Sequence, residues 1–274
     1  MRPSPTRFHP RSAARARTAE PRTGTWLRWL LALAAAAAPI PLMAQNVGSV
    51  GDGFYFRRPI LSLSVRGGYE RPTAGSDIYG LVTEQLTVNR GDFATGGYQV
   101  DLGVRLSERA EIVLTAGNSS RDVASEFRRY VDNNDLPIEQ STRLQRFPVS
   151  LGVRYAVTAP GERISKFAWI PSRITPWVGA GAGVMSYTFS QTGDFVDFET
   201  LNVFRDEYKA SGWAPMAYAS LGTELRLTTR FSLMGDLRYT ASRGSMNASR
   251  GAFVGFDKID LSGGSASLGL TMRL

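Results

Sequence analysis

In several segments of the chain, arginine and acidic residues lie at positions that alternate with apolar residues. In residues 96–106, for example, Asp101 and Arg105 alternate with Val100, Leu102 and Val104. Alternation at a period of two places the charged side chains on one face of a β-strand and the apolar side chains on the other. The charged residues in this pattern are Arg66, Glu70, Asp101, Arg105, Glu111, Arg154, Glu224, Arg226, Asp236, Arg238 and Arg273.

Two kinds of chemistry fit a strand face that carries both arginines and carboxylates. If the strands close into a small barrel, these side chains point into a narrow lumen, and salt bridges between them would seal it. Alternatively, a ring of positive charge would favour the passage of anions. The arginines of such a ring, near the ends joined by the shortest turns, are Arg105, Arg154, Arg226 and Arg273. We expect the sealed lumen and keep the anion path as an alternative.

Histidine and cysteine, the residues most often used in catalysis, are almost absent. His9 is the only histidine, and there is no cysteine. If the leader described below is cleaved, the mature chain cannot use a histidine base or ligand. Known barrel hydrolases use a histidine, so the serines of 118–120 do not predict one, and the glycines of 179–183 lie in a strand segment rather than before a helix. We expect a protein that is not an enzyme and has no cofactor or metal.

Two acidic segments outside the alternating pattern could bind a cation or a partner. Residues 191–212 combine five acidic side chains with Phe195, Phe198, Phe204 and Tyr208. Carboxylate oxygens suit calcium, and aromatic rings suit a partner surface. The segment 132–135 is a weaker calcium candidate because it lacks the spacing of a known binding loop. Solvated cover is the commoner role of such loops, and the sequence does not identify a loop ligand.

Eight segments carry the alternating pattern. In 174–190 we expect Val178, Ala180, Ala182 and Val184 to face outward and the intervening glycines inward. In the last segment, Ile259 and Leu261 are out of phase with the residues that follow, which predicts a bulge at 263–264. The terminal strand then has one apolar face formed by Leu268, Leu270, Met272 and Leu274. The eight segments are about 59–70, 96–106, 110–119, 142–157, 174–190, 214–227, 230–241 and 258–274.

The first residues have the pattern of an export signal. We expect a signal peptide over 1–44, with a basic start, an apolar run at 30–38 and a small-residue cleavage context at 42–44. Seven arginines and one glutamate in this segment account for most of the formal net charge of +8, so the mature chain lacks the strongly basic surface of a nucleic-acid-binding protein. Residues 45–58 would form a short periplasmic segment and 59–274 the barrel domain.

Aromatic residues lie near both ends of the predicted strands. Such positions are typical of the two girdles that hold a barrel at the membrane interfaces. The predicted girdle residues are Tyr69, Tyr98, Tyr187, Phe189, Trp213 and Tyr239 near the long connections, and Tyr155, Trp177 and Phe231 near the short ones. Long connections at one end and short turns at the other also fit an outer-membrane barrel.

These features together resemble a known family. The segments 146–155, 176–183, 237–239 and 260–263 look like those of the small bacterial outer-membrane β-barrel proteins related in architecture to OmpA and OmpW. The resemblance implies an all-β, eight-stranded, antiparallel up-and-down transmembrane barrel in the bacterial outer membrane. It also implies contacts with outer-membrane lipid and with the assembly machinery.

Three functions fit this sequence. We expect a non-enzymatic role in the cell envelope, either structural or through binding by the surface loops. The first alternative, implied by the resemblance to OmpW, is a narrow channel for small solutes or hydrophobic molecules. The second is a soluble periplasmic lipocalin-like barrel, which would turn the apolar strand faces inward.

Overall fold

The computed structural model describes residues 58–274 apart from 133, 166–167, 198–199, 201, 247–252 and 254. The predicted signal peptide and nearly all of the predicted periplasmic segment therefore lie outside the described residues. Within the described part, no helix is long and apolar enough to cross a membrane.

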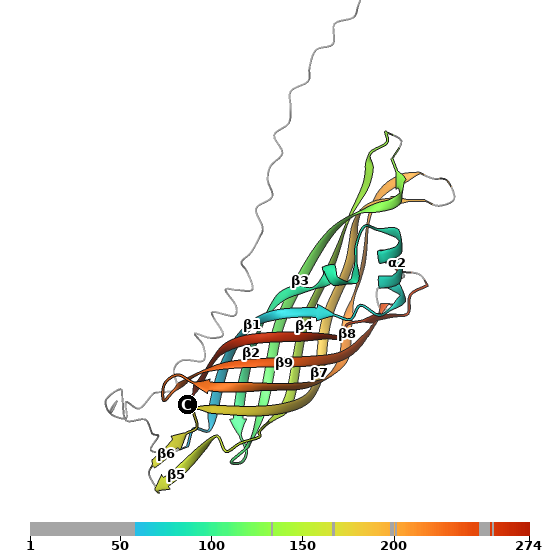
Figure 1. Ribbon diagram of the computed structural model, residues 1–274. Helices are drawn as coiled ribbons and strands as arrows, with labels where there is room; N and C mark the ends of the chain where they lie inside the picture. The colour runs from blue at the N-terminus through green and yellow to red at the C-terminus, as the bar shows by residue number, and fades with distance from the viewer. Residues whose placement is uncertain are drawn as a thin grey trace, which may run out of the picture. The chain divides into compact units, whose positions relative to one another are not determined.

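Eight of the described strands form one closed ring. Each strand of the ring pairs antiparallel with the next along the chain, and the last pairs with the first. The predicted eight-stranded up-and-down barrel is confirmed (Figure 1). The strands of the ring are β1 (Leu61–Pro72), β2 (Thr95–Arg105), β3 (Ala110–Val131), β4 (Pro137–Ala156), β7 (Ile174–Val196), β8 (Val203–Arg226), β9 (Phe231–Ser245) and β11 (Gly263–Arg273).

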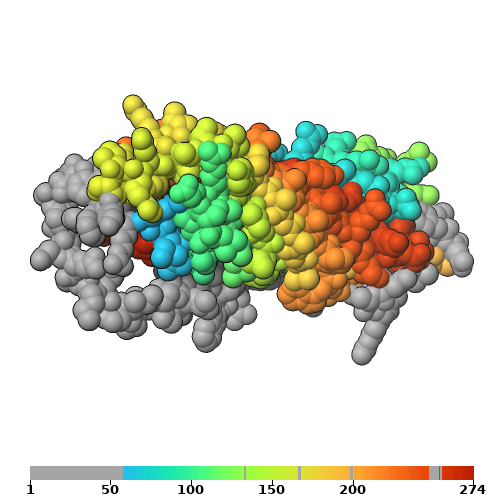
Figure 2. All heavy atoms as spheres, turned by 90° about the horizontal axis from the view of Figure 1, so that it is seen from below, coloured from blue at the N-terminus to red at the C-terminus, as the bar shows by residue number. Residues whose placement is uncertain are grey.

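The shorter elements lie at the two ends of the ring. Helix α2 (Asp77–Gln85) and the 3-10 turn η1 (Arg90–Phe93) connect β1 to β2, and β10 (Lys258–Asp260) precedes β11. The hairpin of β5 (Gly161–Ser165) and β6 (Ala168–Pro171) connects β4 to β7. Figure 2 shows the α2 region, in cyan, and the hairpin, in yellow, at opposite ends of the barrel. We call these the loop end and the turn end.

The outer face of the barrel changes from apolar to polar along the strands. From the turn end up to Tyr69, Trp213 and Tyr239, the outward side chains are mostly large, apolar and exposed. Beyond this level β3, β4, β7 and β8 continue for several residues, and their outward positions become polar, as at Asp122 and Arg143. The predicted segments 110–119 and 142–157 therefore missed the polar halves of two long strands.

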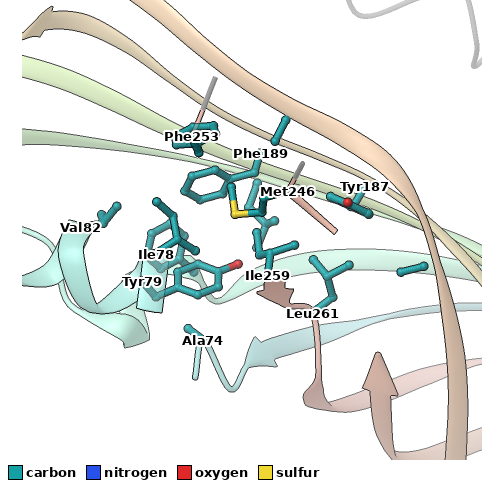
Figure 3. Close-up of a cluster of buried hydrophobic side chains, with 14 of the residues drawn as sticks. Ala74, Ile78, Tyr79, Val82, Tyr187, Phe189, Met246, Phe253, Ile259 and Leu261 are labelled. Atoms are coloured by element: carbon teal, nitrogen blue, oxygen red, sulfur yellow. The ribbon is translucent and has the colours of Figure 1, made fainter. Parts of the chain in front are cut away.

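The interior changes in the opposite sense. At the level of the apolar outer band it is polar and charged, whereas at the loop end it is a hydrophobic core. In Figure 3, Ile78, Tyr79 and Val82 of α2 point towards Phe189 and Ile259. The ring of Tyr79 packs edge-on against Phe189, with 5.8 Å between centroids. Helix α2 thus closes the loop end by supplying apolar side chains to the interior.

The bulge predicted at 263–264 is wrong. Both β10 and β11 pair with β9, and their registers are continuous, from Ile259 opposite Gly244 to Gly264 opposite Tyr239. Ile259 and Leu261 are fully buried because they point inward, into the hydrophobic core at the loop end. The apolar residues change faces along this segment because the interior is apolar at the loop end and polar further along β11.

We expect a charge on the apolar outer band to destabilise the protein. Leu270 is exposed on β11, opposite Val65 and Leu233. Leu270→Arg should lower the free energy of unfolding by about 2–4 kcal/mol if this surface faces lipid, measured by reversible urea unfolding in lipid vesicles. Gln145→Arg, outward on the polar half of β4, is the control and should change it little. Equal effects would contradict a lipid-facing band.

Candidate functional site

Arg66 lies at the centre of a buried ion-pair network in the lumen. Its side chain is 1% exposed and contacts Asp101 at 2.9 Å and Asp236 at 2.7 Å. It also donates to the side-chain oxygen of Gln99, at 2.9 Å. Strand β1 pairs with β2, which carries Asp101, and with β11, which pairs in turn with β9 and brings Asp236 close. One arginine thus joins carboxylates from both sides of the β1–β11 closure.

Further pairs extend this network towards both ends. On the turn side, Arg154 contacts Asp101 at 3.2 Å and Glu111 at 3.5 Å, and Arg273 forms an ion pair with Glu224. On the loop side, the guanidinium of Arg146 contacts Glu70 at 2.9 Å, and that of Arg238 lies 4.2 Å from the ring centroid of Tyr218. Arg238 also lies 3.9 Å from Asp236. Most of the charged residues singled out in the sequence are therefore brought together inside the barrel.

The ion pairs leave little free space in the lumen. A cavity of about 30 Å³ lies on the turn side, among Arg105, Arg154 and Glu224. Another of about 30 Å³ lies on the loop side, among Glu70, Arg146 and Arg238. Arg66 and its two carboxylates lie between these levels. The two spaces share no lining residue, so neither offers a solute a path through the lumen.

Arg105 and Arg226 are inward but lie outside this pairing. Each has a buried Nη1 atom with no hydrogen-bond partner among the described residues. The guanidinium of Arg105 lies 5.9 Å from the ring centroid of Trp169 on β6. Both arginines are at the turn end, where the sequence placed its candidate anion ring.

Six of the predicted girdle residues are on the outer face. Trp213 is 64% exposed, near the level at which the outer face becomes polar. At the turn end, Tyr155 and Phe231 lie outward on β4 and β9. The other outward residues of the predicted girdle are Tyr69, Tyr98 and Tyr239.

The girdle positions predicted for Trp177, Tyr187 and Phe189 are wrong. All three lie on the face of β7 that points into the barrel, and they are buried. The guanidinium of Arg154 lies 4.5 Å from the ring centroid of Trp177, and Gly222 on β8 makes room for that ring, since a Cβ there would come within 2.5 Å of it. The inward glycines of β7 thus share the interior with aromatic rings as well as with arginines.

The terminal strand lies on the outer face as its pattern predicts. Leu268, Leu270 and Leu274 are exposed, and Met272 is partly buried. The N–H of Leu274 donates to the carbonyl of Leu61, at 2.9 Å, so the pairing with β1 continues to this residue.

The loop end contains an apolar cavity that the sequence did not predict. The loop-end cavity has a volume of about 200 Å³, and its lining includes Leu86, Phe127, Phe195, Tyr208, Phe253 and Phe256. Two of these, Phe195 and Tyr208, belong to the segment singled out as a possible partner surface, and their rings pack edge-on at 4.7 Å. Leu81, Val82 and Leu86 come from α2 and the residue after it, where the sequence suggested only a long loop. Their helical spacing was the available signal.

The acidic residues considered as calcium ligands do not form a metal site within the part of the chain that the structure describes. Within the described residues, no group of three or more acidic, histidine or cysteine side chains is close enough to hold an ion. Asp132 instead accepts the backbone N–H groups of Asn134 and Leu136, both at 2.8 Å, which lowers the pKa of its carboxyl group. Phe198 and Glu199, from the other acidic segment, lie outside the described residues.

No protein-family model and no curated protein matches this sequence. Among solved structures, Neisserial surface protein A is 11% identical, with 78% of this chain and 97% of that one covered and a TM-score of 0.42. The outer membrane protein OprG from Pseudomonas aeruginosa is 12% identical, with 80% and 99% covered and a TM-score of 0.41. The outer membrane protease OmpT from Escherichia coli is 10% identical, with 84% and 99% covered and a TM-score of 0.38.

The chain has the fold of a small outer-membrane β-barrel protein. The strand ring establishes this fold, in agreement with the resemblance indicated by the sequence. Similarity at such low sequence identity concerns the fold alone, and the similar structures include a protease as well as a surface protein. The functional argument therefore rests on the side chains of this chain.

We expect removal of one carboxylate from the buried network to be costly. Asp236→Ala would leave Arg66 and Arg238 without one of their acidic neighbours, and breaking a buried pair typically costs about 3–5 kcal/mol of unfolding free energy. The matched control is Asp122→Ala, which breaks the exposed pair with Arg143, where the side chains are 51% and 55% exposed. This change should cost less than about 1 kcal/mol. Urea unfolding in vesicles measures both, and similar values would contradict a structural role for the network.

Proposed function

We propose that this protein is a non-enzymatic barrel of the bacterial outer membrane whose lumen is closed and whose loop end binds a ligand through an apolar group. The pairing of Arg66 with both Asp101 and Asp236 is the observation that carries the closed lumen. Outer-membrane lipid would contact the apolar outer band, and the assembly machinery would insert the barrel.

The distribution of side chains supports a membrane location. A soluble lipocalin-like barrel requires apolar strand faces inside along its whole length, but from the turn end up to Tyr69, Trp213 and Tyr239 the apolar faces point outward and the charged faces inward. Exposed leucines around the barrel would be unfavourable in water and favourable in lipid. Outward aromatic residues near both ends of this band, such as Trp213 and Phe231, suit the interfaces.

The positions of the hydroxyl–carboxylate pairs argue against an enzyme. Ser62 donates to Glu111 and Ser267 to Asp236, but both carboxylates are also engaged by arginines inside the lumen. A nucleophile needs a base that can accept its proton and a substrate within reach. These sealed pairs offer neither.

The loop-end cavity supports a binding role. Aromatic and aliphatic side chains dominate its lining, and the amides of Gln140 and Gln191 add polar groups to its wall. A volume of about 200 Å³ suits an aromatic ring or a short acyl segment. The cavity lies beyond the apolar outer band, so its ligand would come from the aqueous side.

The closed lumen can be tested by conductance. Purified, folded protein in a planar bilayer should give no discrete conductance steps, because Arg66 and its partners fill the section of the lumen that an ion must cross. Steps that decrease or change selectivity in Arg105→Ala and Arg226→Ala would instead support the narrow channel. Heat-dependent gel mobility of each sample verifies that the barrel is folded.

The loop-end cavity can be tested with a neutral fluorescent probe, N-phenyl-1-naphthylamine, added to protein in lipid nanodiscs. We expect saturable binding, and Phe195→Ala should weaken it by about tenfold, the loss expected when one aromatic contact is removed. Phe204→Ala is the control, because this exposed ring packs on Phe195 but does not line the cavity. Identical binding by both variants and by empty nanodiscs would contradict the proposal.

A further inference from the structure

The turn end of the lumen holds more positive than negative charge. Arg58, Arg105, Arg154, Arg226 and Arg273 meet there, and we call them the turn-end arginines. The carboxylates near them are already engaged, beginning with Glu108, which pairs with Arg58 at 3.8 Å. Glu224 pairs with Arg273, while Glu111 and Asp101 pair with Arg154.

Among the residues that the structure describes, two guanidinium groups of this cluster form no ion pair. The Nη1 atoms of Arg105 and Arg226 are both buried and have no hydrogen-bond partner among the described residues. A buried donor on a charged group is costly unless an acceptor reaches it. The arrangement therefore favours a negatively charged acceptor from outside the chain.

Trp169 on β6 holds part of this cluster in place. Its buried ring lies 5.7 Å from the guanidinium of Arg58 and 5.9 Å from that of Arg105. Attraction between each cation and the ring fixes both arginines without neutralising their charge. The hairpin that carries Trp169 thus orients both guanidinium groups. Arg58 also pairs with Glu108, whereas Arg105 forms no ion pair among the described residues.

A small cavity lies next to these donors. It has a volume of about 30 Å³ and reaches the turn Ser107–Ala110 at the surface. Arg105, Arg154 and Arg273 line it together with the carboxylates of Glu108, Glu111 and Glu224. Adjoining it is a smaller space of about 10 Å³ that includes Arg226. Both spaces share Glu224, Arg273, Thr175 and Pro160.

We infer that the turn-end arginines bind a small oxyanion, of the phosphate type, that enters from the short-turn side of the barrel. Arg105 and Arg226 supply the unpartnered donors, and Arg154 and Arg273, held by their acidic partners, supply further positive potential. Guanidinium groups match the geometry of phosphate oxygens well. The site is a blind pocket rather than a path, because the Arg66 ion pairs lie above it.

The test uses the folded protein in phosphatidylcholine nanodiscs, titrated with inorganic phosphate by calorimetry at constant ionic strength with chloride. We expect saturable binding of one phosphate, with Arg105→Gln and Arg226→Gln each weakening it by about tenfold, as for loss of a charged hydrogen bond. Arg71→Gln, exposed at the loop end of β1, is the control and should leave binding unchanged. Heat-dependent gel mobility excludes variants that misfold.

A second measurement needs no variant and separates the two sources of phosphate. Free phosphate should raise the unfolding temperature of the wild-type protein more than chloride at equal ionic strength. If a phospholipid head group occupies the site instead, phosphatidylglycerol nanodiscs should abolish the calorimetric signal of added phosphate. Absence of saturable binding in phosphatidylcholine, or binding that is indifferent to both substitutions, would overturn the inference. Neither result bears on the loop-end cavity.

Discussion

The pairing of β1 with β11 is the constraint on which the other features depend. A strand edge within lipid would leave backbone N–H and C=O groups without partners, so a barrel must close completely. Here the closure runs from Ser62 opposite Arg273 to Pro72 opposite Gly263. It places β11 beside β1, with β9 as the next strand, while β2 lies on the other side of β1, which is why Asp236 and Asp101 both reach Arg66. The central ion pairs are therefore a consequence of the closed topology.

The same strands serve two environments by exchanging the polarity of their faces. Where the outer face is apolar, the inward residues are charged and paired, as in Arg154 with Glu111. Where β3, β4, β7 and β8 extend beyond the level of Tyr69, Trp213 and Tyr239, the outer face is polar and the interior is apolar, like that of a water-soluble protein. Helix α2 is needed only in this second region, because a wide apolar interior open to water requires a cover. Phe189 of β7 packs on that cover.

The strands were predictable from the sequence because polar and apolar residues alternate at a period of two in both regions, whichever face is apolar. What the alternation cannot indicate is which face points inward. Trp177, Tyr187 and Phe189 were assigned to the outside because they are aromatic, yet their parity matches the inward glycines of β7. Ile259 and Leu261 looked out of phase for the same reason. The loop-end cavity was not predictable, since α2 and the outer parts of β7 and β8 come together only in the folded barrel.

The difference between the centre and the turn end of the lumen follows from the cost of desolvating charge. At the centre, water is excluded, and an unpaired guanidinium would be strongly destabilising, so Arg66 has two carboxylates within 2.9 Å. Near the turns, the cavity beside Arg105 reaches the surface, so an anion from solution can supply the missing acceptor. Within the described residues, Arg105 and Arg226 form no ion pair there, and the ring of Trp169 lies 5.9 Å from the guanidinium of Arg105. The positive end of the lumen is tolerated because it is open, and the centre is neutralised because it is closed.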